Sequence, residues 1–235
     1  ARALKAEGWQ VIASARTETD IGVLRAAGLE AFRLDYADPA SIGEFFESAM
    51  AATGGRCDAL FNNGAYGQVG ALEDLPVDAL RAQFEANFFG WHDLTRRAIP
   101  VMRMQGQGRI VQCSSILGLI PYRFRGAYNA SKHALEGLSV TLALELAGSG
   151  IHVSIIEPGP IATKFTANAL KHFHRNIDIG NSVHREAYEA QLRRLDAEGP
   201  SAKGKLGPDA VHKALRHALT ARHPRYHYAV TGQAK

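Results

Sequence analysis

Residues 108–132 read GRIVQCSSILGLIPYRFRGAYNASK, an apolar run that ends in two serines and leads into a long helical pattern. The run at residues 109–114 predicts a buried strand, and Ser115 follows its carboxyl end, where α/β sheets bind ligands. Tyr128 and Lys132 are four residues apart in the helical pattern, so their side chains share one helix face. The stretch therefore predicts an α/β fold with a polar triplet at the end of a strand.

The triplet is suited to proton transfer. An ammonium group near a phenol favours the ionised oxygen, so Lys132 is expected to lower the pKa of Tyr128 from about 10 toward neutral pH. Such a tyrosine can give or take a proton at a carbonyl or alcohol. A Tyr–Lys pair at this spacing arises by chance in about a quarter of such chains. The alternative is a solvated serine beside a surface Tyr–Lys pair, but the combination with Ser115 favours a catalytic site.

Length and composition limit the class of protein. The 235 residues, 46% hydrophobic and 21% charged, suffice for one domain with a substantial core. No apolar run approaches the roughly 18 to 20 residues of a membrane span, and the start shows no secretory signal. Cys57 and Cys113, the only cysteines, have no metal-ligand spacing, so we predict neither a disulfide framework nor a metal site. A reducing, cytoplasmic setting fits best.

The formal net charge of +4 comes from scattered basic residues interleaved with acidic ones. Phosphate tracking needs a concentrated basic face, so we expect no nucleic-acid partner. The densest basic stretch, residues 212–225, is interpreted as a solvated helix face. An anionic partner or a membrane surface is the alternative.

Helical patterns alternate with short apolar runs along the chain. We predict strands at residues 9–15, 31–34, 59–62, 109–114 and 151–157, and helices at residues 1–7, 22–27, 40–53, 77–104 and 127–147. This alternation is typical of a doubly wound, three-layer sandwich with a mostly parallel sheet. Residues 161–207, which include a charged helical stretch at 185–198, predict a substrate lid. The alternative is a helical connection packed into the core.

These features resemble the short-chain dehydrogenase/reductase family of the Tyr-x-x-x-Lys type, over almost the whole chain. Ser115, Tyr128 and Lys132 match its catalytic constellation, and Asn87, in EANFFG at residues 85–90, matches its helix asparagine. The resemblance implies one NAD(P)-binding, Rossmann-like domain over residues 1–235. Members that act on simple carbonyls, hydroxysteroids and retinoids look most similar.

The resemblance also implies a cofactor site. Residues 158–163 match the Pro-Gly segment that closes over the nicotinamide, with Thr163 on the carboxamide, and Asp35 matches the residue that contacts adenine. The loop Asn62-Asn63-Gly64-Ala65 exchanges the last two residues of the family's Asn-Asn-Ala-Gly. The implied cofactor-binding residues are Arg16, Asp35, Tyr36, Asn62, Gly64, Ala65, Tyr128, Lys132, Pro158, Gly159, Ile161 and Thr163.

The predicted strand at residues 9–15 matches the second strand of the family, and the residues at its end bear on which cofactor binds. Ala15 stands where a carboxylate would select NAD, and Arg16 can accommodate a 2′-phosphate. We expect NADP(H) to be preferred and NAD(H) to be possible. The alternative is that Arg16 stacks on adenine or faces solvent.

The family carries a first strand and a Gly-rich phosphate loop ahead of the helix with which this sequence starts. Neither is present before Ala1. We therefore expect a longer functional protein, with a further strand in the middle of the sheet.

The implied reaction is reversible hydride transfer between the nicotinamide and a substrate carbon. Tyr128 is the general acid or base, Lys132 also bonds the nicotinamide ribose, Ser115 positions the substrate oxygen, and Asn87 holds a proton-relaying water. Apolar residues between Ser115 and Tyr128, with Phe165 and Phe173 in the lid, predict a hydrophobic ketone, aldehyde or secondary alcohol.

Other interpretations remain open from the sequence. One is a catalytically silent NAD(P)-binding regulator, and others are an epimerase or dehydratase and a purely structural protein. His172 and His174 do not share a helix face and are expected to be surface residues. The two long helices are expected to form a homodimer or homotetramer.

Overall fold

The computed structural model describes residues 1–198 and 205–231. Parallel strands in this part of the chain form a pair, β1-β2, and a four-stranded sheet in the order β3-β4-β5-β6. The strands are β1 (Ile12–Ala15), β2 (Glu30–Arg33), β3 (Ala59–Asn62), β4 (Gly108–Cys113), β5 (Ile151–Glu157) and β6 (His227–Ala229). The helices are α1 (Arg2–Ala6), α2 (Glu18–Ala26), α3 (Pro39–Ala52), α4 (Val77–Phe84), α5 (Gly90–Gln105), α6 (Gly126–Glu145), α7 (Phe165–Asn176), α8 (Arg185–Glu198) and α9 (Pro208–Thr220).

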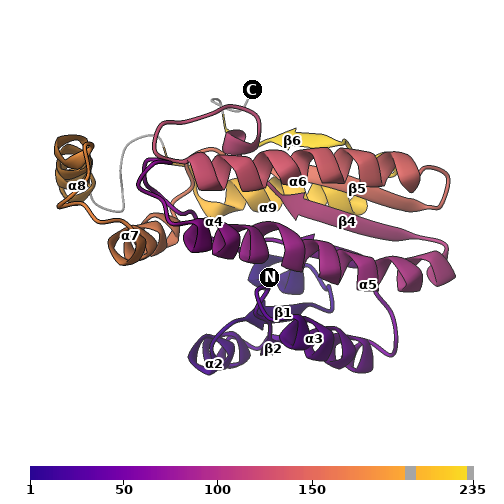
Figure 1. Cartoon of the computed structure of the whole chain (residues 1–235). Coiled ribbons are helices and arrows are strands. Elements are labelled where there is room, and N and C mark those ends of the chain that lie inside the picture. The colour runs from indigo at the N-terminus through magenta and orange to yellow at the C-terminus, as the bar shows by residue number, and fades with distance from the viewer. Residues whose placement is uncertain (199–204, 232–235) are drawn as a thin grey trace.

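Neighbouring strand residues point to opposite faces, which builds the expected three layers. Ile110 of β4 packs with Met102 of α5 and Leu146 after α6, whereas Val111 packs with Leu215 of α9 on the other face. Figure 1 shows α6 on the near side of the sheet and α9 behind it. The α/β sandwich predicted from the sequence is therefore confirmed.

The hydrogen-bonded ladder is interrupted between β1 and β3 in the described part of the chain. The β1-β2 pair is instead joined to the larger sheet by apolar packing. Leu34, Ile42 and Leu94 form a buried cluster, and Ile12 of β1 and Leu60 of β3 both pack against it.

Several elements differ from the sequence prediction. The expected helix at residues 77–104 is divided by a π-helical turn, Glu85–Phe89, that carries Asn87. Helix α2 begins earlier than expected because the Thr17 side chain caps it by accepting from the Asp20 amide. Strand β6 was not predicted, because three residues are too few to show an alternation of apolar and polar side chains.

The segment interpreted as a lid contains α7 and α8, which extend to one side of the sheet in Figure 1. Residues 199–204 of that segment lie outside the described residues. None of the helices described is both long and apolar enough to cross a membrane.

Candidate active site

The carboxyl ends of β4 and β5 and the first turns of α6 bring the predicted triplet together. Ser115 follows β4, and its Oγ lies 3.5 Å from the Pro158 carbonyl oxygen beyond β5 and accepts from the Leu117 amide at 3.1 Å. Tyr128 is buried on α6, with the Phe165 ring of α7 edge-on at 5.4 Å. Ser115, Tyr128 and Lys132 all line one cavity of about 730 Å³.

Lys132 is held away from water by specific contacts. Its side chain is buried, and Nζ donates to the Cys113 carbonyl oxygen at 2.8 Å. The same nitrogen lies 4.2 Å from the centre of the Trp91 ring, a cation–π distance. Burial lowers the pKa of Lys132 to about 8. Lys132 thus loses its proton more readily than an exposed lysine, and its amino group keeps a hydrogen-bond acceptor and an aromatic face as partners.

The pKa of Tyr128 moves in the direction opposite to the one expected from the sequence. Burial raises it above the ordinary value, and a hydrogen bond with the Ser115 side chain lowers it by less. Lys132 does not offset the burial, because its Nζ is turned to Cys113 and Trp91 and lies 5.8 Å from the Tyr128 ring centre. The expectation that Lys132 lowers this pKa is therefore wrong for the protein without cofactor, and Tyr128 is held in its protonated form.

Asn87 is fully buried in the π-helical turn, and its side chain hydrogen-bonds the backbone of the loop after β3. Its Nδ2 donates to the Tyr66 carbonyl oxygen at 2.8 Å, and its Oδ1 accepts from the Tyr66 amide at 3.2 Å. Gln83, which the sequence analysis did not identify, donates to the same carbonyl oxygen and accepts from the Gln68 amide. The two side-chain amides fix the loop that carries Gly64 and Ala65.

The exchanged residues of that loop fit their surroundings. A Cβ at position 64 would lie 3.0 Å from a ring carbon of Tyr36, so the glycine allows the ring to pack closely. The Gly64 carbonyl oxygen accepts from Nε1 of Trp91 at 3.0 Å. Gly64 is therefore held by packing against Tyr36 and by a hydrogen bond from Trp91.

The segment after β5 forms another wall of the large cavity. Pro158, Gly159, Ile161 and Thr163 line it, as the resemblance implies. The other lining residues are mostly apolar and include Ile116, Leu117, Ile120, Pro160 and Phe165. The sequence analysis did not identify Arg125 and Lys205, which also line this space.

A second cavity, of about 370 Å³, contains the residues expected at the adenosine end. Arg16, Asp35, Tyr36, Gly64 and Ala65 line it, and Ala65 also lines the larger cavity. Asn62 lines neither. Its Nδ2 donates to Thr95 Oγ1 and Gln112 Oε1, both at 3.0 Å, so the side chain implied as cofactor-binding instead joins β3 to α5 and β4.

Helix α7 adds basic residues to the second cavity that the sequence did not place there. Lys171, His172 and Arg175 line it together with Arg16. His172 is half-buried and stacks on Tyr66, with ring centres 3.9 Å apart, so it is less exposed than a freely solvated surface residue. His174 is exposed, as expected. The adjoining cavities therefore suit a dinucleotide, because one is rich in cations for phosphate and the other offers the polar triplet.

Comparison with known proteins supports this interpretation. A family model described as short chain dehydrogenase matches residues 1–173. The uncharacterized oxidoreductase YbbO of Escherichia coli is 38% identical over 228 residues, covering 97% of this chain and 78% of its own. Retinol dehydrogenase 8 of Bos taurus is 36% identical over 170 residues, covering 69% of this chain and 54% of its own.

Solved structures show the same architecture. A short-chain dehydrogenase from Streptomyces avermitilis has a TM-score of 0.79 and 32% identity, covering 100% of this chain and 83% of its own. A Burkholderia phymatum enzyme of this type, in complex with NAD, has a TM-score of 0.79 and 26% identity, covering 97% and 83%. A variant of actinorhodin polyketide ketoreductase with NADPH has a TM-score of 0.80 and 26% identity, covering 100% and 90%.

Proposed function

The chain belongs to the short-chain dehydrogenase/reductase family, and from this premise we propose that it transfers hydride between NADP(H) and a hydrophobic ketone, aldehyde or secondary alcohol. The observation that carries the proposal is the meeting of Ser115, Tyr128 and Lys132 in one largely apolar cavity of about 730 Å³. The family's oxidoreductases depend on NAD(P). The preference for NADP(H), the substrate class and the residue roles below are the proposal.

NADPH, held by the residues that line the two adjoining cavities, would supply the hydride for the carbonyl carbon. Tyr128 donates its phenolic proton to the carbonyl oxygen, and in the reverse direction it removes the proton of the alcohol. Because burial raises the pKa of Tyr128, the tyrosine is protonated at neutral pH and ready for reduction. Ser115 Oγ orients and polarises the substrate oxygen. Lys132 contributes positive charge beside the reacting groups and has further N–H donors for the nicotinamide ribose.

The substrate class follows from the cavity wall. Ile116, Leu117, Ile120 and Phe165 give a surface on which an apolar group is favourably buried. The similarity to retinol dehydrogenase 8 supports a bulky apolar alcohol or the carbonyl compound formed from it. Helices α7 and α8 are proposed as the lid over this pocket, because Phe165 of α7 contacts the Tyr128 ring.

The preference for NADP(H) is supported by charge at the second cavity. Arg16, Lys171 and Arg175 outnumber the acidic residues Asp20 and Asp35 among its lining side chains. A 2′-phosphate adds two negative charges that such a site would favour over a hydroxyl.

We also propose a homodimer or homotetramer. Large apolar side chains are exposed on the outer faces of the helices considered for assembly. They are Val77 of α4, Phe89 of the π-helical turn, Met104 of α5 and Leu144 of α6. Light scattering during size-exclusion chromatography tests this, since a single monomeric mass at micromolar concentration would contradict it.

The function is tested by following NADPH and NADH oxidation with a panel of hydrophobic ketones and aldehydes. The expected result is turnover with NADPH that the Tyr128→Phe variant loses while still binding the cofactor. The control is Tyr226→Phe, which removes a hydroxyl that donates to the Val140 carbonyl oxygen and lines neither cavity. Cofactor binding without turnover, in either direction, would favour the regulatory alternative.

A further inference from the structure

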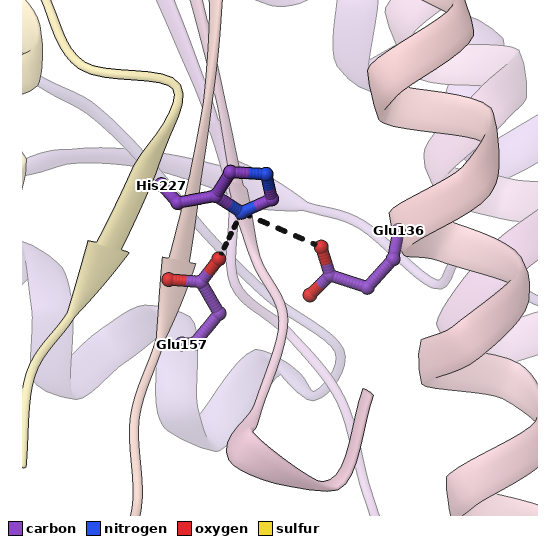
Figure 2. A group of neighbouring side chains, drawn as sticks. All are labelled: Glu136, Glu157 and His227. Carbon is purple, nitrogen blue, oxygen red and sulfur yellow. Dashed lines mark hydrogen bonds and ion pairs between the residues drawn. The ribbon is translucent and has the colours of Figure 1, made fainter. Parts of the chain in front are cut away.

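Three ionisable side chains meet outside both cavities, as Figure 2 shows. Glu136 lies on α6, one helical turn beyond Lys132, Glu157 is the last residue of β5, and His227 is the first residue of β6. Their ligand atoms all lie within 4.8 Å of one another. We call these three residues the carboxylate–histidine cluster.

The side chains converge on one point in Figure 2. His227 Nδ1 lies 2.5 Å from Glu157 Oε1 and 3.9 Å from Glu136 Oε2. Glu136 is 8% exposed and Glu157 is 1% exposed, so both carboxylates are buried. The His227 side chain is 49% exposed, which leaves a route from solvent to the cluster.

The buried oxygens are poorly satisfied by the protein. Within the described residues, neither carboxylate oxygen of Glu136 nor Glu157 Oε2 has a hydrogen-bond partner. The Ser114 hydroxyl lies beside Glu136 and favours its ionised form, but it makes no well-formed hydrogen bond there. Lys132 is close enough to favour the ionised form too, yet its Nζ donates to Cys113. Two buried carboxylates facing one imidazole are costly unless a proton or a further cation neutralises them, and the orphaned oxygens that converge on one point suit a cation.

We propose that Glu136, Glu157 and His227 bind a divalent transition-metal cation, of which Zn²⁺ and Mn²⁺ are the best candidates. One imidazole nitrogen and two carboxylates are ordinary ligands for these ions, and three protein ligands leave a position for water on the exposed side of His227. Ligand atoms about 2.1 Å from a shared ion lie at most about 4.2 Å apart, so the present spacing needs shifts of about 1 Å or less.

The proposed ion has a structural consequence. It would join β6 to β5 and α6, which lie about 70 residues or more before β6 in the sequence. Mg²⁺ and Ca²⁺ prefer sites made of oxygen ligands, so they should bind this cluster more weakly. The inference does not depend on the proposed substrate or cofactor.

The first test titrates chelator-treated protein with Zn²⁺, and separately with Mn²⁺, by calorimetry. We expect about one equivalent to bind per chain. A hundredfold excess over Kd should raise Tm by about 5 °C or more, and Mg²⁺ should raise it less. Absence of saturable binding of both ions would overturn the proposal.

The second test compares Glu136→Gln, Glu157→Gln and His227→Asn with a matched control. Each should weaken Zn²⁺ binding by about tenfold or more. The control is His184→Asn, because His184 lies 2.6 Å from a single carboxylate, Glu73, outside the cluster. Binding that persists unchanged in all three cluster variants would place the ion elsewhere and overturn the assignment.

A third measurement needs no variant and so does not depend on folding of the substituted chains. Pulsed electron paramagnetic resonance of the Mn²⁺-loaded protein should show coupling to one imidazole nitrogen, that of His227. Coupling to no imidazole, or direct coordination by two imidazoles, would contradict the ligand set.

Discussion

Lys132 and Glu136 are buried ionisable residues one turn apart on α6, but the hydrogen bonding of their side chains differs. Lys132 Nζ has a carbonyl oxygen at 2.8 Å and an aromatic face at 4.2 Å. The Glu136 carboxylate has no hydrogen-bond partner among the described residues. A buried charge that is hydrogen-bonded can be kept for chemistry, whereas one whose oxygens lack hydrogen bonds is a candidate ligand for a cation that the protein alone does not supply.

The largest expected effect is at the catalytic turn. Tyr128→Phe should lower kcat by about 10²- to 10⁴-fold, because it removes the proton donor and little else. Steady-state NADPH oxidation measures this, with cofactor binding followed by fluorescence. A loss smaller than tenfold would mean that another group protonates the substrate.

The second prediction concerns the pH dependence of stability that the buried Lys132 produces. Its folded pKa of about 8 lies below the ordinary value of a lysine, so above pH 8 the unfolded chain binds more protons. The contribution of Lys132 to the free energy of unfolding of the cofactor-free protein should therefore rise with pH between about 8 and 10, by at most about 1.4 kcal/mol per pH unit. Burial raises the pKa of the Cys57 and Cys113 thiols to about 11, and these groups act in the opposite direction, so the prediction is for the difference between wild type and a variant without Lys132.

Urea unfolding at a series of pH values tests this by comparing wild type with Lys132→Met. The free energy of unfolding of wild type relative to the variant should rise with pH, since only wild type loses the Lys132 proton and both proteins keep the two cysteines. Equal pH slopes for the two proteins would show that the lysine is not desolvated as the structure indicates.

A smaller effect is expected at the second cavity. Arg16→Ala should raise KM for NADPH by about tenfold and change KM for NADH much less, because only NADPH carries the 2′-phosphate. Arg222→Ala, beyond α9 and outside both cavities, is the control. Equal changes for the two cofactors would contradict the preference for NADP(H).

The smallest expected effect is on the stability of a Glu136 variant. Burial raises the pKa of its carboxyl, so ionising it at pH 8 weakens the metal-free fold. Glu136→Gln should then stabilise the metal-free protein by about 1 kcal/mol. Added Zn²⁺ should reverse the order, since only wild type retains the full ligand set. Destabilisation of the metal-free variant would show that the carboxylate is already well partnered.

The sequence predicted the elements that carry a strong periodic pattern. Strand β4, helix α6 and the positions of Ser115, Tyr128 and Lys132 follow from apolar runs and helical spacing. The α/β fold was predicted for the same reason. The resemblance to a family added the segment after β5, whose residues do line the cavity.

What the sequence could not give depends on tertiary contacts. The pKa of Tyr128 is set by burial and by where Lys132 Nζ points, and neither can be read from a four-residue spacing. The partial burial of His172 could not be predicted, because its stacking contact with Tyr66 joins segments that are distant in sequence. Glu136 and His227 meet only because the unpredicted β6 pairs with β5.

Isotope transfer tests the central claim most directly. NADPH deuterated at the transferred position is incubated with a hydrophobic ketone, and the product is analysed by mass spectrometry. We expect wild type to yield an alcohol with one deuterium on the carbinol carbon, and Tyr128→Phe to yield almost none. Bound cofactor without deuterium in any product across the ketone panel, together with no oxidation of the matching alcohols, would contradict the oxidoreductase assignment.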